Sequence, residues 1–304
     1  MVRPGGNPHV RAALLMLAST VMFALMAVAI RLASQTLHTF EVAFFRNLFG
    51  LLATLPLLWR HGPSLLRTTE LPRYFFRCFI GILSMFCGFW AIGHLPLAQA
   101  ISLSYSSPIF VTIAAFFLLG EAVRARRWTA VLLGFIGVLV IVRPGSTAFT
   151  AGMLVAVAAA VFSGIVSIQI KQLSAVEPAD RIVFYTTLIW VPMSLLPALA
   201  VWEWPQGIVW AYVVAAGLLG TGGHMFWTRA LKIGEVSALT PISFMQLPVV
   251  ALAGWVLFDE QLDRWTLLGA GIIFASNFYI AHREAQLARR SATHAPVEAA
   301  KPGN

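Results

Sequence analysis

The sequence predicts an all-α membrane protein with ten transmembrane helices, arranged as two inverted five-helix repeats. Three observations predict this fold: an apolar composition, ten hydrophobic stretches of membrane-spanning length, and an internal repeat with an odd number of stretches in each copy. Composition, segment length and self-similarity are separate properties of the chain, so they support the fold independently.

The composition is that of a membrane protein. Hydrophobic residues make up 59% of the 304 residues and charged residues only 11%, against about 25% charged residues in ordinary globular domains. A soluble chain could not solvate its surface with so few charges. The net charge of +9 would also fit nucleic-acid binding, but the basic residues lie in short loops between apolar stretches. We therefore expect the lipid bilayer and a small-molecule substrate as partners, and no nucleic acid.

Ten mostly apolar stretches match the ~20 residues that an α-helix needs to cross a bilayer. Backbone groups inside the bilayer must be paired within the segment, so these stretches are predicted to be helices. The predicted helices cover residues 12–34, 39–59, 73–94, 96–119, 127–143, 150–172, 179–202, 207–229, 235–258 and 265–282.

The first five stretches recur in the second five at an offset of about 139 residues. Residues 41–45 recur at 180–184, and Gly81 and Glu121 recur as Gly220 and Glu260. Five crossings per copy would insert the second copy in the opposite orientation. This predicts two domains, residues 12–143 and 150–282, followed by a polar tail, residues 286–304, which we expect to be disordered in the cytoplasm. Inverted repeats are typical of transporters, whose substrate site lies where the copies meet.

The distribution of Lys and Arg predicts that both termini are cytoplasmic. With that orientation, sixteen of the 21 basic residues lie on the inner side, or seventeen with Arg77 near the start of the third helix. Arg31, Arg143 and Arg264 lie outside. Glu121 then falls inside and its counterpart Glu260 outside, as inversion requires.

Two repeat-related helices carry polar faces. The helix 96–119 presents Gln99, Ser102 and Ser106 at i, i+3 and i+7, with Tyr105 alongside, and the helix 235–258 presents Ser237, Thr240 and Ser243. Such faces avoid lipid and line a water-filled cavity, or else form hydrogen bonds between helices. Pro108, Pro241 and Pro248 interrupt the same two helices and allow kinks. Kinked helices at matching positions of the two halves indicate the substrate-lining elements.

Further candidates lie on two other helices. The helix 207–229 carries His224 and Trp227 on the same stripe as Gly217 and Gly220, and the helix 150–172 carries Ser163 and Ser167. The glycines either allow close helix packing or open space for a ligand. His224 either faces that ligand or, as the favoured interpretation, donates a hydrogen bond to a neighbouring helix.

Arg46 is the charge embedded most deeply in a predicted helix. It could meet an anionic group of the substrate, although pairing with Glu41 or a carbonyl is favoured. No Asp or Glu lies at mid-depth, whereas transporters driven by ion gradients commonly use a buried carboxylate. This absence favours facilitated diffusion, and a proton route through His224 or His94 remains open. Cys78 and Cys87 are expected to be free thiols, and no metal or cofactor is expected.

The whole pattern resembles the drug/metabolite transporter superfamily, in its EamA branch. The resemblance rests on segments 98–121 and 238–260, in which Pro108 and Pro248 precede an apolar run that closes on Glu121 and Glu260. It covers about residues 12–282. It implies a central cavity lined by helices one, three, four, six, eight and nine, with helices five and ten at the periphery. Among bacterial relatives with this layout, the group that we expect the chain to resemble is the aromatic amino-acid exporters of the YddG type.

The predicted function is therefore export of small metabolites, amino acids first, across the bacterial inner (plasma) membrane by alternating access. A wall of aromatic, amide and hydroxyl groups without paired charges suits a zwitterion better than a sugar nucleotide, whose phosphates call for several basic residues. A proton-coupled drug or metabolite exporter of the same superfamily is the alternative. A polytopic membrane enzyme is a remote one, because the chain has no Gly-x-Ser-x-Gly or His-Glu-x-x-His motif. We expect a monomer or a weak homodimer.

Overall fold

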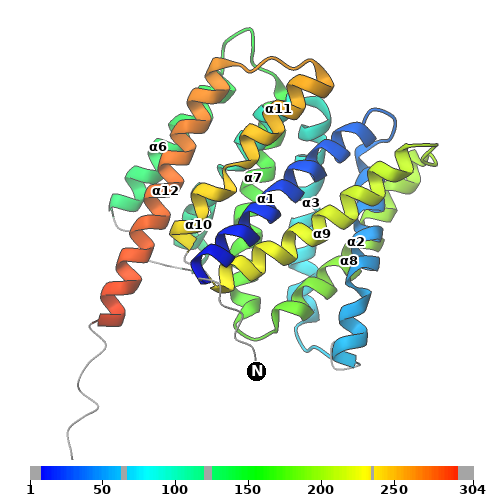
Figure 1. Cartoon of the computed structure of the whole chain (residues 1–304), viewed down its shortest axis with the longest axis horizontal. Helices are drawn as coiled ribbons and strands as arrows, with labels where there is room; N and C mark the ends of the chain where they lie inside the picture. The colour runs from blue at the N-terminus through cyan, green and yellow to red at the C-terminus, as the bar shows by residue number, and fades with distance from the viewer. Residues whose placement is uncertain (1–7, 63–66, 120–124, 234–235, 294–304) are drawn as a thin grey trace, which may run out of the picture.

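The computed structural model describes residues 8–62, 67–119, 125–233 and 236–293, and the regular elements in these ranges are all helical (Figure 1). The elements are α1 (Pro8–Ala33), α2 (Thr39–His61), α3 (Leu71–His94), α4 (Leu97–Ser104), α5 (Ser107–Leu119), α6 (Ala125–Val142), α7 (Ala151–Ser174), α8 (Ala179–Ala198) with the short 3₁₀ helix η2 (Leu199–Val201), α9 (Val209–Ile233), α10 (Val236–Ser243), α11 (Gln246–Phe258) and α12 (Arg264–Thr293).

The predicted all-α membrane class is confirmed. Within the described ranges, seven helical segments are long and apolar enough to cross a bilayer, and Trp128–Val142 is a shorter apolar helix. Large apolar side chains such as Phe117, Leu196 and Leu252 are well exposed, which in a membrane protein is the surface that lipid covers. The number of crossings and their orientation stay predictions.

The predicted helices 96–119 and 235–258 are each two helices. The first breaks at Tyr105, between α4 and α5, and the second breaks between α10 and α11. Pro108 and Pro248 lie in the first turns of α5 and α11, where a residue without an N–H is tolerated. The bounds of α4 and α5 recur in α10 and α11 after a shift of 139 residues, so the two copies break at matching positions.

Residues 286–293 were expected in a disordered tail, but they are helical, because α12 continues to Thr293. This stretch is rich in Ala, Arg, Leu and Gln, which favour helix. Extending an existing helix also needs no new nucleus. The remaining predicted tail, residues 294–304, lies outside the described residues.

The helices pack in pairs that follow the internal repeat: the α1–α9 pair corresponds to the α3–α7 pair, and α2–α8 and α6–α12 each join a helix to its own counterpart. In the interior α1 packs against α9 and α3 against α7, while α2 packs against α8 and α6 against α12. Figure 1 shows α6 and α12 along one side of the bundle and α2 and α8 toward the opposite side, with α1 and α9 between them. A substrate path between the two copies would therefore run among the interior pairs.

Glycines bring α6 and α12 into backbone contact. A Cβ atom on Gly137 would lie 2.9 Å from the carbonyl oxygen of Gly269, and one on Gly269 would lie 2.6 Å from the carbonyl oxygen of Gly137. Gly134 is also close-packed, against Ile109, whereas nothing lies within 4 Å of the Cβ position of Gly271. Of these four glycines, Gly271 is the one whose Cβ position meets open space.

Candidate functional site

The two helix breaks meet in space. The Tyr105 ring stacks on Phe244, its counterpart in the second copy, with ring centroids 4.2 Å apart. The Tyr105 hydroxyl donates to the carbonyl oxygen of Ser243 and lies 3.0 Å from Oε1 of Gln246. The Asn277 amide of α12 donates to the Tyr105 carbonyl oxygen at 2.7 Å. Of the predicted site residues, Tyr105 and Ser243 are therefore brought together, at the contact between the two copies.

Gln99 and Ser102 lie apart from this contact on α4. Gln99 is buried and lines a pocket of about 380 Å³ with Trp90, Met153 and Asp263. Its amide nitrogen lies 3.9 Å from the Met153 sulfur. Ser102 donates to the carbonyl oxygen of Ala98, one turn earlier in its own helix. The hydroxyl of Ser102 is thus bonded within its own helix, and of these two residues only Gln99 lines the pocket.

The candidates on α7, α9 and α10 form separate groups. The Ser167 hydroxyl is exposed and donates to the carbonyl oxygen of Ser163 at 2.9 Å. The His224 ring packs edge-on against Phe23 of α1, with centroids 5.0 Å apart, and lies 6.5 Å from the Trp227 ring. No hydrogen bond joins the His224 ring to any other described residue, so the favoured interpretation of a bond to a neighbouring helix was wrong. The side chain of Thr240, a residue of α10, lies outside the described residues.

The α9 glycines serve close packing. A Cβ atom on Gly217 would lie 2.9 Å from the Arg46 carbonyl oxygen, and one on Gly220 would lie 2.8 Å from both the Arg46 guanidinium and the Met26 sulfur. Gly223 is equally close to the Phe23 ring. These contacts let α1 and α2 approach α9 closely, and they bring the Arg46 guanidinium onto the α9 backbone.

Arg46 does not pair with Glu41, contrary to the favoured interpretation. The Glu41 carboxylate instead accepts backbone N–H groups of His38, at 2.9 Å, and Glu203. Arg46 is only 6% exposed, and its recorded hydrogen bond is from Nη1 to the neighbouring Asn47 side chain at 3.1 Å. Its Nε is buried without a partner in the described part of the chain.

Arg77 is a second buried arginine, which the charge count placed near the inner start of the third predicted helix and which was not among the predicted site residues. Its side chain is 7% exposed and donates to the Thr186 hydroxyl and weakly to the Cys78 sulfur, while Nε again lacks a partner among the described residues. The guanidinium lies 5.8 Å from the Trp190 ring centroid. A possible signal was its position in α3: Arg77 lies nearly two turns after the helix begins at Leu71.

Polar contacts connect the two arginines through α8. Asn47, beside Arg46, donates to the Ser194 hydroxyl at 3.2 Å, and Ser194 donates to the carbonyl oxygen of Trp190 at 2.6 Å. The Trp190 indole donates to the carbonyl oxygen of Cys78, beside Arg77, at 3.0 Å. Asn47, Trp190 and Ser194 were absent from the predicted site. Trp190 carried a signal, since it is the one tryptophan far from a predicted helix end.

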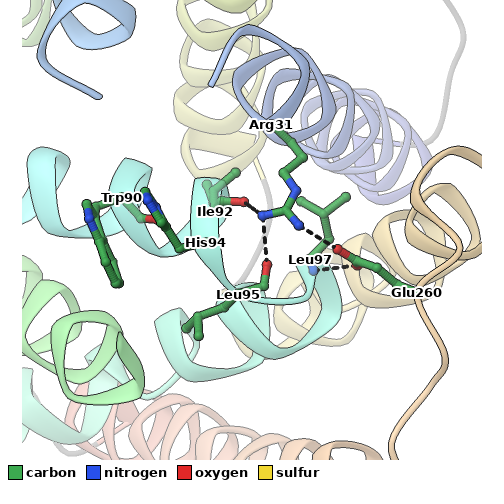
Figure 2. A network of polar contacts seen from close by, with 7 residues as sticks. All are labelled: Arg31, Trp90, Ile92, His94, Leu95, Leu97 and Glu260. Carbon is green, nitrogen blue, oxygen red and sulfur yellow. Dashed lines mark hydrogen bonds and ion pairs between the residues drawn. The ribbon is translucent and has the colours of Figure 1, made fainter. Parts of the chain in front are cut away.

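At one end of the bundle, a single arginine joins three helices (Figure 2). Arg31, near the end of α1, donates to the carbonyl oxygens of Ile92 at 2.9 Å and Leu95 at 3.2 Å, and pairs with Glu260 at 3.2 Å. Glu260 also accepts the backbone N–H of Leu97, at the start of α4, at 2.7 Å. The network therefore ties α1 and the α3–α4 junction of the first copy to the end of α11 in the second.

The comparisons with known proteins agree with this architecture. Residues 10–143 and 150–281 each match the EamA-like transporter family. The chain is 31% identical over 283 residues to the riboflavin transporter of Vibrio cholerae, covering 91% of this chain and 95% of the relative. It is 30% identical to the S-adenosylmethionine uptake transporter of Rickettsia felis, covering 82% of this chain and 84% of the relative.

A third relative, the pseudopaline exporter CntI of Pseudomonas aeruginosa, is 30% identical and covers 86% of this chain and 92% of its own length. A solved crystal structure with 22% sequence identity superposes with a TM-score of 0.63, over 92% of this chain and 98% of that one, and supports the fold alone. Together the family match and these relatives identify a membrane transporter of small molecules rather than an enzyme. The chain belongs to the EamA-like transporter family.

Proposed function

We propose that the chain works by alternating access, with ten membrane crossings in two inverted repeats and both termini in the cytoplasm. Matching hydrogen bonds support the symmetry. Ser19 of α1 donates to the carbonyl oxygen of Gly223 in α9 at 2.9 Å, and Ser84 of α3 donates to the carbonyl oxygen of Ala159 in α7 at 2.8 Å. A shift of about 139 residues exchanges the two contact positions, with donor and acceptor reversed: the donor Ser84 corresponds to the acceptor Gly223, and the acceptor Ala159 lies one residue from the counterpart of the donor Ser19. Equivalent contacts on both sides are what a rocking motion of two related halves requires.

The observation that carries the proposal is the meeting of the two helix breaks at Tyr105 and Phe244. A broken helix has free carbonyl and N–H groups that lipid cannot satisfy, so it is tolerated where protein, water or substrate covers it. Two such breaks at the contact between the copies are typical of a transporter substrate site. We place the path of the substrate beside this contact.

The Arg31–Glu260 network supports one closed gate, which the charge distribution places on the outer side. Its two charged side chains are 19% and 14% exposed, so water screens them weakly. The network joins helices of both copies, and it must therefore break when the copies move apart at that end. In this proposal the gate at that end is closed.

The proposed substrates are small organic metabolites, amino acids first, carried by export in the manner of facilitated diffusion. Aromatic and hydroxyl groups near the breaks suit an apolar side chain, and two buried arginines suit a carboxylate. A flavin-like metabolite is the second candidate, because a relative at 31% identity is a riboflavin transporter.

Reconstitution into liposomes tests the proposal. Proteoliposomes loaded with unlabelled L-phenylalanine should take up labelled L-phenylalanine by exchange, and the rate should not respond to an imposed pH gradient. Riboflavin should be tested in parallel. Tyr105→Ala should slow exchange, while Tyr279→Ala, at a side chain 45% exposed on α12, is the matched control. Exchange of riboflavin without any amino acid would overturn the amino-acid assignment, and exchange of no metabolite would overturn the transport mechanism.

A further inference from the structure

We propose that Arg46 and Arg77 bind an anionic group of the transported metabolite, and that this group is a carboxylate. The inference rests on the proposed transport function and deepens it, because it assigns the chemical class of the substrate. It takes up the alternative, left open by the sequence, that Arg46 meets an anionic group of the substrate.

The first step is that Arg46 is charged, buried and incompletely bonded. A guanidinium stays protonated in proteins and offers five N–H donors. One hydrogen bond, to Asn47, is recorded, and Nε is buried without a partner within the described residues. An ionisable group at this depth of a membrane protein is costly and generally serves a substrate or ion path.

The second step is that Arg77 repeats this situation from another helix. Its Nη1 reaches Thr186 and Cys78, and its Nε is buried and unpartnered within the described residues. Trp190 lies beside the guanidinium and is fixed by its bond to the carbonyl oxygen of Cys78. Gly81 makes room for this indole, since a Cβ atom there would lie 2.8 Å from it. Arg77 is therefore held in place by neutral groups, and none of them balances its charge.

The third step is that both charges converge on one region. Asn47 beside Arg46 bonds to Ser194, Ser194 bonds to Trp190, and Trp190 bonds to Cys78 beside Arg77, so α8 connects the two arginines. Arg46 also reaches the α9 backbone at Gly220, one turn before His224. The two buried guanidinium groups therefore lie on neighbouring helices, because α2 and α3 both pack against α8 and α2 also packs against α9.

The fourth step is that the described carboxylates nearby are engaged elsewhere. Glu41 accepts two backbone N–H groups, Glu177 pairs with Arg181 at 2.5 Å, and Glu260 pairs with Arg31. Arg46 and Arg77 have no carboxylate within 4 Å among the described residues. The positive charges of the two buried arginines are not neutralised by an acid, so binding of an anion beside them is electrostatically favourable. A carboxylate fits the planar guanidinium donors in a bidentate manner.

The test compares ligands that differ only in this group. The purified full chain is titrated with 3-phenylpropionate and with 3-phenylpropanamide, and the midpoint of thermal unfolding is followed, because a ligand that binds the folded state raises it. We expect the carboxylate to raise the midpoint and the amide not to. Arg46→Gln and Arg77→Gln should each weaken the apparent affinity by about 10-fold or more, as expected for a charge-assisted hydrogen bond.

Arg73→Gln is the matched control, because it removes an arginine of the same helix as Arg77 whose side chain is 64% exposed and pairs with Glu70. It should leave the carboxylate response unchanged. Equal responses to the acid and the amide, no response of the wild type to the acid, or a full response in both arginine variants would each overturn the inference. Inorganic phosphate serves as a further probe, and a response to phosphate alone would assign a phosphate group instead.

Ligand-free protein gives a second readout that separates binding from a structural role. A structural arginine stabilises the fold, so its loss lowers the unfolding midpoint. An uncompensated buried charge does the opposite, and Arg46→Gln without ligand should therefore unfold at a higher temperature than wild type. A lower midpoint for both Arg46→Gln and Arg77→Gln would refute the proposal. If riboflavin is exchanged while no carboxylate binds, transport stands and only the carboxylate assignment fails.

Discussion

Replacing Glu260 by glutamine removes the negative charge that joins α11 to α1 and α4 in Figure 2. The glutamine keeps the size and one acceptor oxygen, so the helix ends stay packed. What is lost is the ion pair with Arg31 and the charge at the start of α4, where Leu97 donates its N–H at 2.7 Å. The perturbation therefore acts on the closed state of this end and leaves the interior of the bundle alone.

The size of the effect follows from burial. The two side chains are 19% and 14% exposed, so the pair resembles a charge-assisted hydrogen bond in the interior, about 1.5–3 kcal/mol, more than an exposed surface pair. An anion at a helix N-terminus adds about 0.3–1 kcal/mol. A loss of roughly 2 kcal/mol shifts the ratio of open to closed states about 30-fold.

The change in the ratio of open to closed states can be measured with a cysteine introduced one helical turn from Arg31, toward the interior of the bundle. Ala27 lies one turn below Arg31 on α1 and is 1% exposed. In the Ala27→Cys background, a small membrane-impermeant thiol reagent added outside should react about 30-fold faster when Glu260→Gln is also present. The parent without Ala27→Cys corrects for Cys78 and Cys87, which are free thiols inside the bundle.

Asp263→Asn provides the matched control. Asp263 pairs with Arg143 at 2.7 Å near the same end of the bundle, but the pair joins the chain after α6 to the start of α12 and does not reach α1. Its loss should leave the labelling rate at Ala27→Cys unchanged. Equal labelling with and without Glu260→Gln, or equal acceleration by Asp263→Asn, would show that the Arg31–Glu260 pair does not hold this end closed.

Two further predictions concern packing and the helix breaks. Gly137→Ala should lower the stability by about 1–3 kcal/mol, because its Cβ would lie 2.9 Å from the Gly269 carbonyl oxygen, whereas Gly271→Ala should not destabilise, since its Cβ meets open space. Thermal unfolding in detergent measures both, and equal loss in the two variants would contradict the packing argument. Tyr105→Phe removes the hydroxyl bonded to Ser243 and should lower stability by about 1 kcal/mol and slow exchange in proteoliposomes. Unchanged exchange would remove this contact from the transport cycle.

The fold was largely predictable because its signals are strong in a single sequence. Membrane-length apolar runs give the helices, and Pro108 and Pro248 lie at the two breaks, but proline alone does not predict a break, because α2 continues through Pro56 and α8 through Pro192. The Gly137–Gly269 contact was predictable from small residues alone. The length of α12 was not, because polar residues after a membrane helix fit a tail or a helical extension equally well.

The candidate site was harder to predict. Spacing gives the face on which a residue lies, but it does not give the partner across that face. Ser102 bonds within its own helix, although its place on the polar stripe looks the same as that of Gln99. Arg77 near the start of a predicted helix looked like a residue of the inner membrane surface, because its burial depends on how α3 packs against α8. Glu41 accepts backbone N–H groups and therefore does not pair with Arg46. This arrangement also depends on tertiary packing, which residue spacing does not reveal.

The stacked pair Tyr105 and Phe244 has a consequence for the energetics of the cycle. In a protein whose two copies were identical, exchanging their conformations would give outward- and inward-facing states of equal energy. Here one copy carries a hydroxyl and the other does not, and the hydroxyl is bonded in the present state. Exchange would place the phenyl ring of Phe244 where the phenol now lies, losing about 0.5–1.5 kcal/mol. In the proposed alternating-access cycle, this one oxygen atom contributes a bias of roughly 2- to 12-fold toward the present state.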